Sequence, residues 1–513
     1  MAYAIRHLLG MPNRANLVAA VATMRLPPLG RTPISALRLP ASGGALRLYS
    51  SARVKDMGDA DINALRAQQA RLMDTLHSTC AFGTGKRWGS APTETGMSRL
   101  SLSDADKQAR DWFVATARGL GCDVTVDAMG NIFAVRPGRR PGPPTFAGSH
   151  LDTQPSGGRY DGILGILAGI EMLTVLRDNK IETEFPVGVV NWTNEEGARF
   201  PISMVSSGVW AGEIPLERAH NLKEVGGGTA TMKSELERIG YLGSTPASYR
   251  STPMAAHFEL HIEQGPILEA EQKKVGVVRG VQAYRWFTID VFGREAHTGT
   301  TPLANRADAM LVAARLITHS HRVATAHAAL ASTGILTLSP GSTNTIPGRV
   351  TFTLDVRAPA DATVDAAEAD LRRDFADLAA GRDIGGLTNY FSTPRAQGAG
   401  VAPPRVEWRT DTDSKATVFD DECVGAVRSA AEAVVGGQGA GEESGLVREL
   451  SSGAGHDSVY TNRRCPTAMI FVPSRAGVSH HPEEYTSPEG CTTGASVLLQ
   501  SVLRYDRLRA RRE

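Results

Sequence analysis

The spacing of apolar residues changes several times along this chain, and each change predicts an element. From Asp161 to about Asn179 apolar residues recur every three or four positions, which predicts a buried helix. Phe185–Trp192 is a short apolar run that predicts a buried strand, and Ala256–Leu260 predicts another. A helix is predicted over Asp420–Val435 and a further strand over Thr467–Val472. Together these elements indicate an α/β fold.

Between Leu260 and Asp420 the pattern of apolar and polar residues is different. Arg285–Val291, Thr333–Leu338 and Arg349–Val356 alternate apolar and polar residues, as in strands of a sheet with one solvated face. Helices are predicted over Asn305–His319 and Asp361–Leu378. We therefore predict an inserted α+β lid domain at 283–414, between the two parts of a catalytic domain at 56–282 and 415–513.

Composition narrows the class of protein. A chain of 513 residues is too long for one ordinary core, which favours two domains. The net charge of +1 gives no support to a nucleic acid or an anionic membrane as partner, and no apolar run approaches the length of a transmembrane helix. The cysteines are odd in number and form no Cys-x-x-Cys pair, so we expect reduced, mostly buried thiols. They are Cys80, Cys122, Cys423, Cys465 and Cys491.

The first 55 residues differ from the rest of the chain. They contain arginines, serines, alanines and leucines, and no acidic residue occurs before Asp56. This composition is typical of a mitochondrial transit peptide, and Arg47–Ser51 resembles a matrix-processing site. We predict a presequence at 1–55 and a mature protein in the mitochondrial matrix. The alternative is a cytoplasmic protein with a disordered extension or a misassigned start codon.

Histidines and carboxylates gather at the trailing ends of the predicted strands, the edge of an open α/β sheet where sites form. Imidazole and carboxylate ligands in this mixture suit zinc or a similar divalent ion. Two adjacent glutamates suggest one metal ligand and one proton shuttle. The residues are His150, Asp152, Asp161, Glu195, Glu196, His261, His480 and His481, and spacing alone does not separate the last two. The sequence therefore predicts a metal-dependent hydrolase.

Longer motifs around these residues resemble those of a known enzyme group, the dinuclear-zinc amidohydrolases related to aminoacylases and zinc carboxypeptidases. Within it they resemble the N-carbamoyl-amino-acid hydrolases, and most of all the fungal-type β-ureidopropionases (β-alanine synthases). The resemblance runs from about Trp88 to Asp506. The motifs are Gly148–Pro155, Tyr160–Gly169, Asn194–Phe200, His257–Glu269, Gly280–Tyr284 and Ser452–Ser458. It implies a catalytic domain with a mixed sheet flanked by helices, and a lid that also forms a homodimer.

The resemblance also implies roles for the clustered residues. Each subunit would hold two divalent ions, with Asp161 bridging them; zinc is the first choice, and manganese and cobalt are the alternatives. Glu195 would be the general base that moves a proton from water to the leaving nitrogen. Asp152 would accept the second N–H of His150 and fix its tautomer. The implied metal ligands are His150, Asp161, Glu196, His261 and His480.

A second set of residues concerns the substrate. In the family that the chain resembles, the motifs around Gln264, His297, Asn344, Arg357 and His456 bind the carboxylate and the ureido group. Arg357 suits a carboxylate because a guanidinium offers two parallel donors, and Gln264 and Asn344 offer amide donors. His297 would stabilise the oxyanion from the partner subunit. Taken alone, Arg357 fits a surface salt bridge and His297 a loop histidine.

The resemblance predicts hydrolysis of the ureido C–N bond of N-carbamoyl-β-alanine to β-alanine, CO2 and ammonia, a step of pyrimidine breakdown. Gly240–Tyr249 favours this reading, whereas His480–Tyr485 is closer to bacterial carbamoylases and Thr298 stands where the family usually has alanine. The alternative is an N-carbamoyl-L-amino-acid hydrolase or an allantoate amidohydrolase. The motifs disfavour a dipeptidase. A non-catalytic scaffold is disfavoured too, because the five ligands and the base are all present.

Overall fold

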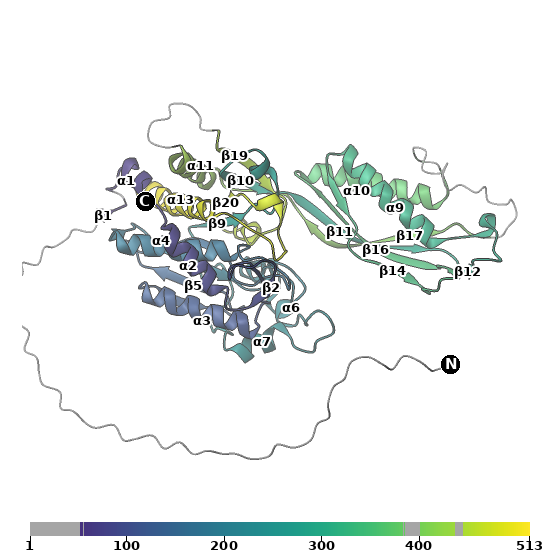
Figure 1. Ribbon diagram of the computed structural model, residues 1–513, viewed down its shortest axis with the longest axis horizontal. Coiled ribbons are helices and arrows are strands. Elements are labelled where there is room, and N and C mark those ends of the chain that lie inside the picture. The colour runs from purple at the N-terminus through teal and green to yellow at the C-terminus, as the bar shows by residue number, and fades with distance from the viewer. Residues whose placement is uncertain (1–51, 55, 383, 385–400, 437–444, 513) are drawn as a thin grey trace, which may run out of the picture. The chain divides into compact units, whose positions relative to one another are not determined.

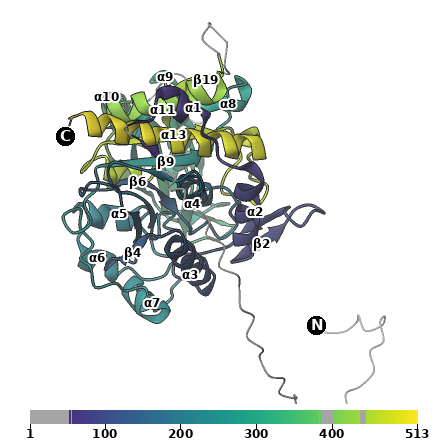
Figure 2. The same ribbon diagram turned by 90° about the vertical axis from the view of Figure 1, so that its left-hand side faces the viewer.

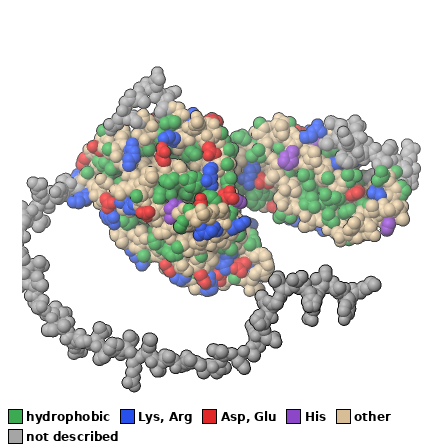
Figure 3. Space-filling view, viewed as in Figure 1, with side chains coloured by type: hydrophobic (Ala, Val, Ile, Leu, Met, Phe, Trp, Pro, Cys, Tyr) green, Lys and Arg blue, Asp and Glu red, His purple; other side chains and the backbone are tan. Residues whose placement is uncertain are grey.

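The computed structural model describes residues 52–54, 56–382, 384, 401–436 and 445–512. Nearly all of the predicted presequence lies outside these residues, so the presequence and the mitochondrial location stay predictions. Within the described residues, no helix has both the length and the apolar character needed to cross a membrane. Acidic and basic side chains both occur across the face shown in Figure 3, in keeping with a net charge near zero.

A mixed sheet forms the centre of the catalytic part (Figure 1). Its strand order is β18-β10-β20-β9-β6-β8-β5-β4, and β19 pairs with β10. The described strands of this sheet are β4 (Asp123–Val126), β5 (Ile132–Arg136), β6 (Thr145–His150), β8 (Val187–Trp192), β9 (Ala256–Ile262), β10 (Val275–Val281), β18 (Thr417–Val418), β19 (Val447–Ser452) and β20 (Thr467–Val472). The four neighbours β20, β9, β6 and β8 run parallel, so their carboxyl ends meet at one edge.

Long helices cover this sheet. Helices α4 (Ile163–Asp178) and α13 (Pro488–Arg512) pack on β6 and β9, and Figure 2 shows α13 next to β9. Helix α11 (Asp421–Val435) packs on β10 and β20, and α3 (Asp104–Gly119) on β4 and β5. The predicted mixed sheet flanked by helices is confirmed.

The start of α4 depends on a glycine. Gly162 has φ 66°, and a Cβ atom there would lie 2.2–2.4 Å from atoms of the His150 ring. Glycine is the residue that adopts this backbone conformation at little cost and leaves room for the imidazole. It therefore lets the chain turn from Asp161 into a buried helix directly beside the end of β6.

The segment after β10 builds a second, antiparallel sheet with its own apolar core, which includes Phe287, Phe352 and Phe375. Its strand order is β13-β16-β11-β17, and β14 also pairs with β16. The strands are β11 (Ala283–Phe292), β13 (Leu330–Ser332), β14 (Leu336–Ser339), β16 (Arg349–Ala358) and β17 (Arg405–Ser414). Helices α9 (Ala309–Ala326) and α10 (Asp361–Ala379) pack on it. The predicted lid contains all of this sheet, and its independence as a domain stays a prediction.

Two elements of the lid differ from expectation. The strand predicted over Thr333–Leu338 begins only at Leu336, because the preceding residues leave the ladder after β13. The helix predicted from Asn305 begins at Ala309. The reason is Asp308, whose carboxylate accepts the N–H of Leu311 at 3.0 Å and caps the helix there.

The remaining elements are short or peripheral. The other helices are α1 (Asp59–Ala64), α2 (Gln69–Thr79), α5 (Val205–Trp210), α6 (Leu216–His220), α7 (Met232–Ile239), α8 (Ile267–Ala270), α12 (Ser458–Thr461) and the 3-10 turns η1 (Leu303–Asn305) and η2 (Arg475–Gly477). The paired short strands are β1 (Ala52–Arg53) with β7 (Ile181–Glu182), β2 (Thr84–Arg87) with β3 (Thr95–Met97), and β12 (Ala296–His297) with β15 (Thr345–Ile346). All five cysteines are free and buried, as predicted.

Candidate active site

The carboxyl ends of the four parallel strands bring distant residues together. His150 is the last residue of β6, and His261 lies one residue before the end of β9. Glu195 and Glu196 follow β8, and His480 follows β20 and η2. The predicted cluster therefore forms at the edge of the sheet where sites form in open α/β folds.

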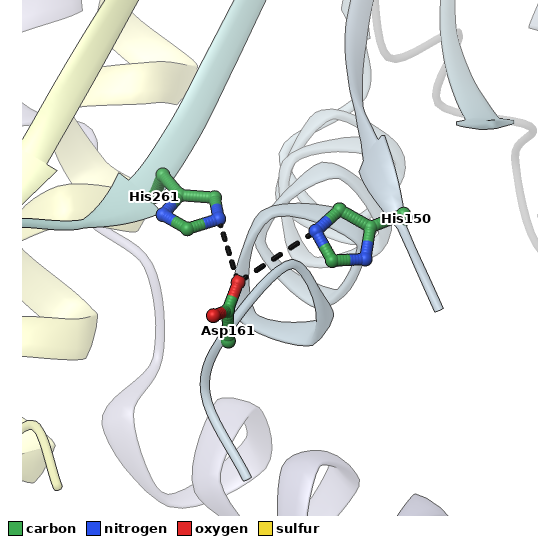
Figure 4. Close-up of side chains that lie close together, drawn as sticks. All are labelled: His150, Asp161 and His261. Carbon is green, nitrogen blue, oxygen red and sulfur yellow. Dashed lines mark ion pairs between the residues drawn. The ribbon is translucent and has the colours of Figure 1, made fainter. Parts of the chain in front are cut away.

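Asp161 lies at the centre of this cluster. Its Oδ1 atom is 2.9 Å from Nε2 of His261 and 3.7 Å from Nε2 of His150, so the two imidazoles face one carboxylate oxygen (Figure 4). Its Oδ2 atom is 3.4 Å from Nε2 of His480, which is also 3.4 Å from Oε2 of Glu196. The two oxygens of Asp161 thus face two separate groups of donors, and the donor atoms within each group lie within 4.8 Å of one another.

The spacing left His480 and His481 unresolved, and the structure places them differently. His480 has φ 54°, a conformation uncommon outside glycine, and this turns its ring toward Asp161. Nδ1 of His481 instead accepts the N–H of Glu483 at 3.3 Å. Only His480 of this pair belongs to the donor groups formed by the described residues.

The hydrogen bonds of the buried histidines test whether the cluster fits metal ions. Nδ1 of His150 lies 2.9 Å from the carbonyl oxygen of Asp152, and Nδ1 of His261 lies 2.8 Å from that of Ile262. A carbonyl only accepts, so each Nδ1 carries a hydrogen, and Nε2 is the ring atom that faces Asp161 and can bind a cation. Nε2 of His150 is buried without a hydrogen-bond partner. Imidazole nitrogens that face a carboxylate need positive charge between them, from a proton or a metal ion, so these residues fit divalent cations.

The charges of the cluster show the same requirement. Burial lowers the pKa of His261, but the neighbouring carboxylate of Asp161 outweighs it and raises this pKa to about 9. Burial raises the pKa of Asp161, but His261 and His480 hold it well below its usual range. Burial and the charge of Asp161 raise the pKa of Glu196 to about 8. The buried carboxylates thus need cationic partners, and the imidazoles already supply part of that charge.

Asp152 holds a different position from the one predicted. Its carboxylate does not bond to His150, because the backbone carbonyl of the same residue takes the Nδ1 hydrogen. The carboxylate instead accepts the backbone N–H groups of Glu195 and Glu196, each at 3.3 Å. The prediction that it fixes the His150 tautomer through its side chain is wrong. Asp152 anchors the backbone of the two glutamates.

The two adjacent glutamates point to different sides. Oε2 of Glu195 lies 3.5 Å from Nε2 of His150, whereas Oε2 of Glu196 lies beside His480 and accepts Nε2–H of Gln154 at 2.8 Å. Burial, and next the charges of Asp457 and Glu196, raise the pKa of Glu195 well above its usual value. A raised pKa makes a carboxylate a stronger proton acceptor, which suits a general base.

A cavity of about 320 Å³ opens onto this cluster. Among the predicted substrate residues, Gln264, Arg357 and His456 line it. His297 and Asn344 do not belong to its described lining: His297 is part of β12, and Asn344 directly precedes β15. Within its own chain, His297 is therefore not part of this site, and its contribution to a partner subunit stays a prediction.

The hydrogen bonds of His297 define what it offers. The ring is exposed, and its Nδ1 accepts the N–H groups of Gly299 at 3.0 Å and Thr300 at 3.2 Å. In the neutral ring the hydrogen then lies on Nε2, which becomes a donor. A donor is what the stabilisation of an oxyanion needs.

Gln264 offers an acceptor rather than the predicted donor. Its Nε2 donates to Oδ2 of Asp161 at 2.8 Å and lies 3.1 Å from Oγ of Ser479, which uses both amide hydrogens. Its Oε1 is buried without a partner. Its φ of 58° is uncommon for glutamine and holds the amide in this position. The free oxygen suits an N–H group of a ureido substrate.

Arg357 lies at the cavity but is already paired. Its Nε and Nη2 donate to the carboxylate of Asp355 at 2.8–3.1 Å, and Nη1 donates to the carbonyl of Gly453 at 2.9 Å. The ion pair that the sequence left as the simpler explanation is therefore present. A guanidinium carries five N–H groups, so one hydrogen on each terminal nitrogen remains for a ligand.

His456 packs against the cluster. Its ring lies edge-on to His261 with centroids 4.5 Å apart, and its Nε2 is 3.0 Å from Oγ of Ser452. Ser452 donates its own hydrogen to the carbonyl of Ala454, so it accepts from His456. Burial, and next the charge of His261, hold the pKa of His456 well below its usual value, so the ring is neutral and its Nδ1 is an acceptor.

Sequence reasoning missed Glu484. This buried carboxylate accepts the backbone N–H groups of Tyr160 and Asp161, both at 3.0 Å, and lies 3.1 Å from Oγ of Ser479. Ser479 is in turn 3.0 Å from Oδ2 of Asp161. Glu484 therefore holds Asp161 from two sides. Its position next to another glutamate, only four residues after His480, resembled a solvated loop and gave no signal of burial.

Comparison with known proteins identifies the family. The sequence profile of peptidase family M20/M25/M40 matches residues 146–504. The chain belongs to this family. It is 38% identical over 442 residues to an N-carbamoyl-L-amino-acid amidohydrolase of Rhizobium meliloti, covering 85% of this chain and 96% of the relative. It is 30% identical over 430 residues to a ureidoglycolate hydrolase of Oryza sativa subsp. japonica, covering 80% of each.

A solved structure agrees with these matches. An amidase of the hydantoinase/carbamoylase family from Burkholderia multivorans has a TM-score of 0.73 and 41% sequence identity, and the match covers 86% of this chain and 99% of that one. These comparisons confirm the predicted α/β fold, and they confirm that the chain is a hydrolase acting on C–N bonds.

Proposed function

We propose that this protein is a metal-dependent N-carbamoyl-L-amino-acid amidohydrolase. It would cleave the ureido C–N bond of its substrate, releasing the L-amino acid, CO2 and ammonia. The observation that carries the metal-dependent part is the arrangement of Asp161, whose two oxygens face one pair of histidines and a separate histidine–glutamate pair. The similarity to the Rhizobium meliloti enzyme supports the substrate class.

Two divalent ions fit this arrangement, with zinc as the first choice because the donors are imidazole and carboxylate. Residues His150 and His261 would hold one ion, His480 and Glu196 the other, and Asp161 would contribute to both. When bound, such ions act as Lewis acids that polarise a carbonyl and lower the pKa of water. The number and identity of the ions are parts of this proposal.

The protein's own groups would do the rest of the chemistry. Glu195 accepts a proton from the attacking water and returns it to the leaving nitrogen. The free Oε1 of Gln264 and the acceptor nitrogen of His456 orient the ureido N–H groups. The free hydrogens of Arg357 bind the substrate carboxylate, and Asp355 holds the guanidinium in place. The donor Nε2–H of His297 would reach the oxyanion from a partner subunit.

The comparisons favour the N-carbamoyl-L-amino-acid hydrolase, which the sequence offered as the alternative, over the β-ureidopropionase. The sequence first indicated a β-ureidopropionase, whose substrate has its carboxylate one carbon further from the ureido group. The relatives described above carry the names of an L-α-amino-acid enzyme and a ureidoglycolate enzyme. In ureidoglycolate and in N-carbamoyl-α-amino acids alike, one carbon separates the carboxylate from the ureido nitrogen. We therefore place the α-substituted class first.

A parallel assay of ammonia release tests this proposal. Zinc-loaded enzyme is given N-carbamoyl-L-leucine, N-carbamoylglycine, N-carbamoyl-β-alanine, ureidoglycolate and allantoate at equal concentration. We expect the highest kcat/KM with an N-carbamoyl-L-α-amino acid. A higher kcat/KM with N-carbamoyl-β-alanine would return the assignment to β-ureidopropionase, and a preference for ureidoglycolate or allantoate would also refute the proposed substrate class.

A further inference from the structure

A second cavity, of about 600 Å³, adjoins the first. Four residues line both, namely Gln264, Arg357, Ala454 and His480. A ligand bound at Arg357 with its ureido group in the first cavity would therefore have the second cavity beside it. The two spaces meet at the guanidinium, where a substrate carboxylate would lie.

Most polar side chains of the second cavity are already bonded to the protein. The carboxylate of Glu263 accepts the backbone N–H groups of Ile267 at 2.8 Å and Leu268 at 2.9 Å. The amide of Gln282 donates to the carbonyl of Gly453 at 2.8 Å. The hydroxyl of Ser479 lies between Asp161 and Glu484. What the cavity offers a ligand is mainly apolar surface, from Ile267, Leu330, Leu450 and Phe471.

Leu330 connects this apolar surface to the carboxylate position. In the β13–β16 ladder it is the direct cross-strand partner of Arg357. Directly paired residues of an antiparallel ladder point to the same face of a sheet. Leu330 is 65% exposed and Ile267 40% exposed, so both present apolar surface that the described residues leave uncovered. Such surface beside a binding arginine suits an apolar group attached close to a carboxylate.

We infer that the second cavity receives the side chain of the substrate's α-carbon, and that this side chain is aliphatic or aromatic. The inference rests on the proposed function. With the carboxylate at Arg357 and the ureido group at Asp161 and Glu195, the α-carbon would lie next to Arg357, which lines both cavities. N-carbamoylglycine and N-carbamoyl-β-alanine have no side chain to fill the space. A charged side chain would meet apolar walls and lose its hydration.

The test compares two substrates that differ only in this side chain. We expect the wild-type kcat/KM for N-carbamoyl-L-leucine to exceed that for N-carbamoylglycine by at least about 10-fold, since single methylene groups in apolar pockets change it about 10- to 200-fold. Leu330→Ser should lower the ratio of the two values by about 10-fold. Leu338→Ser is the matched control, because Leu338 is exposed on β14 of the same sheet, outside the described lining of both cavities.

The outcomes separate this inference from the proposed function. If N-carbamoylglycine and N-carbamoyl-L-leucine are cleaved equally well, or if Leu330→Ser lowers both values alike, the cavity does not hold the side chain. If Leu330→Ser changes the molecular mass of the assembly in solution and lowers kcat/KM equally for both substrates, a second copy of the chain covers Leu330. If no N-carbamoyl-α-amino acid is cleaved, or N-carbamoyl-β-alanine is preferred, the proposed function itself fails.

Discussion

Replacing Glu484 tests how the carboxylate of Asp161 is held. Its Oε1 accepts two buried backbone N–H groups, and its Oε2 lies beside Ser479, which also contacts Asp161. Glu484→Gln keeps Oε1 as the acceptor of both N–H groups. Its new amide can donate to Ser479, which then donates to Asp161, so every group in the network keeps a partner. Glu484→Ala removes all of these bonds.

The expected loss of unfolding free energy follows from the hydrogen-bond partners that each variant removes. A buried donor left without an acceptor costs about 1–3 kcal/mol, so the two orphaned N–H groups in Glu484→Ala should cost roughly 2–6 kcal/mol of unfolding free energy. The groups behind metal ligands also set affinity, and losing one weakens metal binding about 10- to 100-fold. For Glu484→Gln we expect a stability loss below about 1.5 kcal/mol, because the amide oxygen still accepts both N–H groups.

Urea unfolding of the metal-free protein and zinc titration against a competing chelator measure the two effects. Glu483→Ala is the matched control, because Glu483 is the exposed neighbour of Glu484. Its stability and zinc affinity should equal those of the wild type. If Glu484→Ala matched Glu484→Gln in both measurements, Glu484 would not be holding Asp161, and the reasoning would be refuted.

Four further predictions concern catalysis and assembly. Glu195→Gln should keep its metal and lose about 10²–10⁴ in kcat, and near-normal turnover would exclude it as the base. Mixing inactive His297→Ala with inactive Glu195→Gln should restore part of the activity, because a mixed dimer has one intact site; no recovery after confirmed subunit exchange would place His297 elsewhere. Arg357→Lys should lower kcat/KM sharply, because the lysine ammonium cannot offer the two parallel donors of a planar guanidinium; an unchanged kcat/KM would show that Arg357 does not bind the substrate carboxylate. Removing the metal with a chelator should lower Tm, since ions that bind only the folded state stabilise it; an unchanged Tm would contradict binding at this buried site.

The sequence predicted the cluster because most of its residues come directly after short apolar runs that indicate buried strands. His150, Glu196 and His261 each come at the end of a buried apolar run, and parallel neighbours bring such ends together. The strand predicted over Thr467–Val472 is β20 itself, and the helix predicted from Asp161 is α4 to within two residues. Apolar periodicity predicts the positions of these elements because the burial of one or both faces of a helix or strand sets the spacing of its apolar residues.

What the sequence missed depends on hydrogen bonds between distant segments. Neither the burial of Glu484 beneath Asp161, more than 300 residues away in the chain, nor the orientation of the Gln264 amide follows from a local pattern. The sequence correctly indicated that Asp152 lies near the cluster. Its bond to the backbone of Glu195, however, depends on how the loops after β6 and β8 meet. Such contacts are set by tertiary packing, which periodicity does not report.

Metal content per chain tests the central claim most directly. The claim is that Asp161 joins two ion sites built on His150 and His261 on one side and on His480 and Glu196 on the other. Mass spectrometric metal analysis of zinc-loaded wild-type and Asp161→Ala protein should give two equivalents per chain in the wild type and a loss of both in the variant. A single equivalent in the wild type, or two retained by a folded Asp161→Ala protein, would contradict the account.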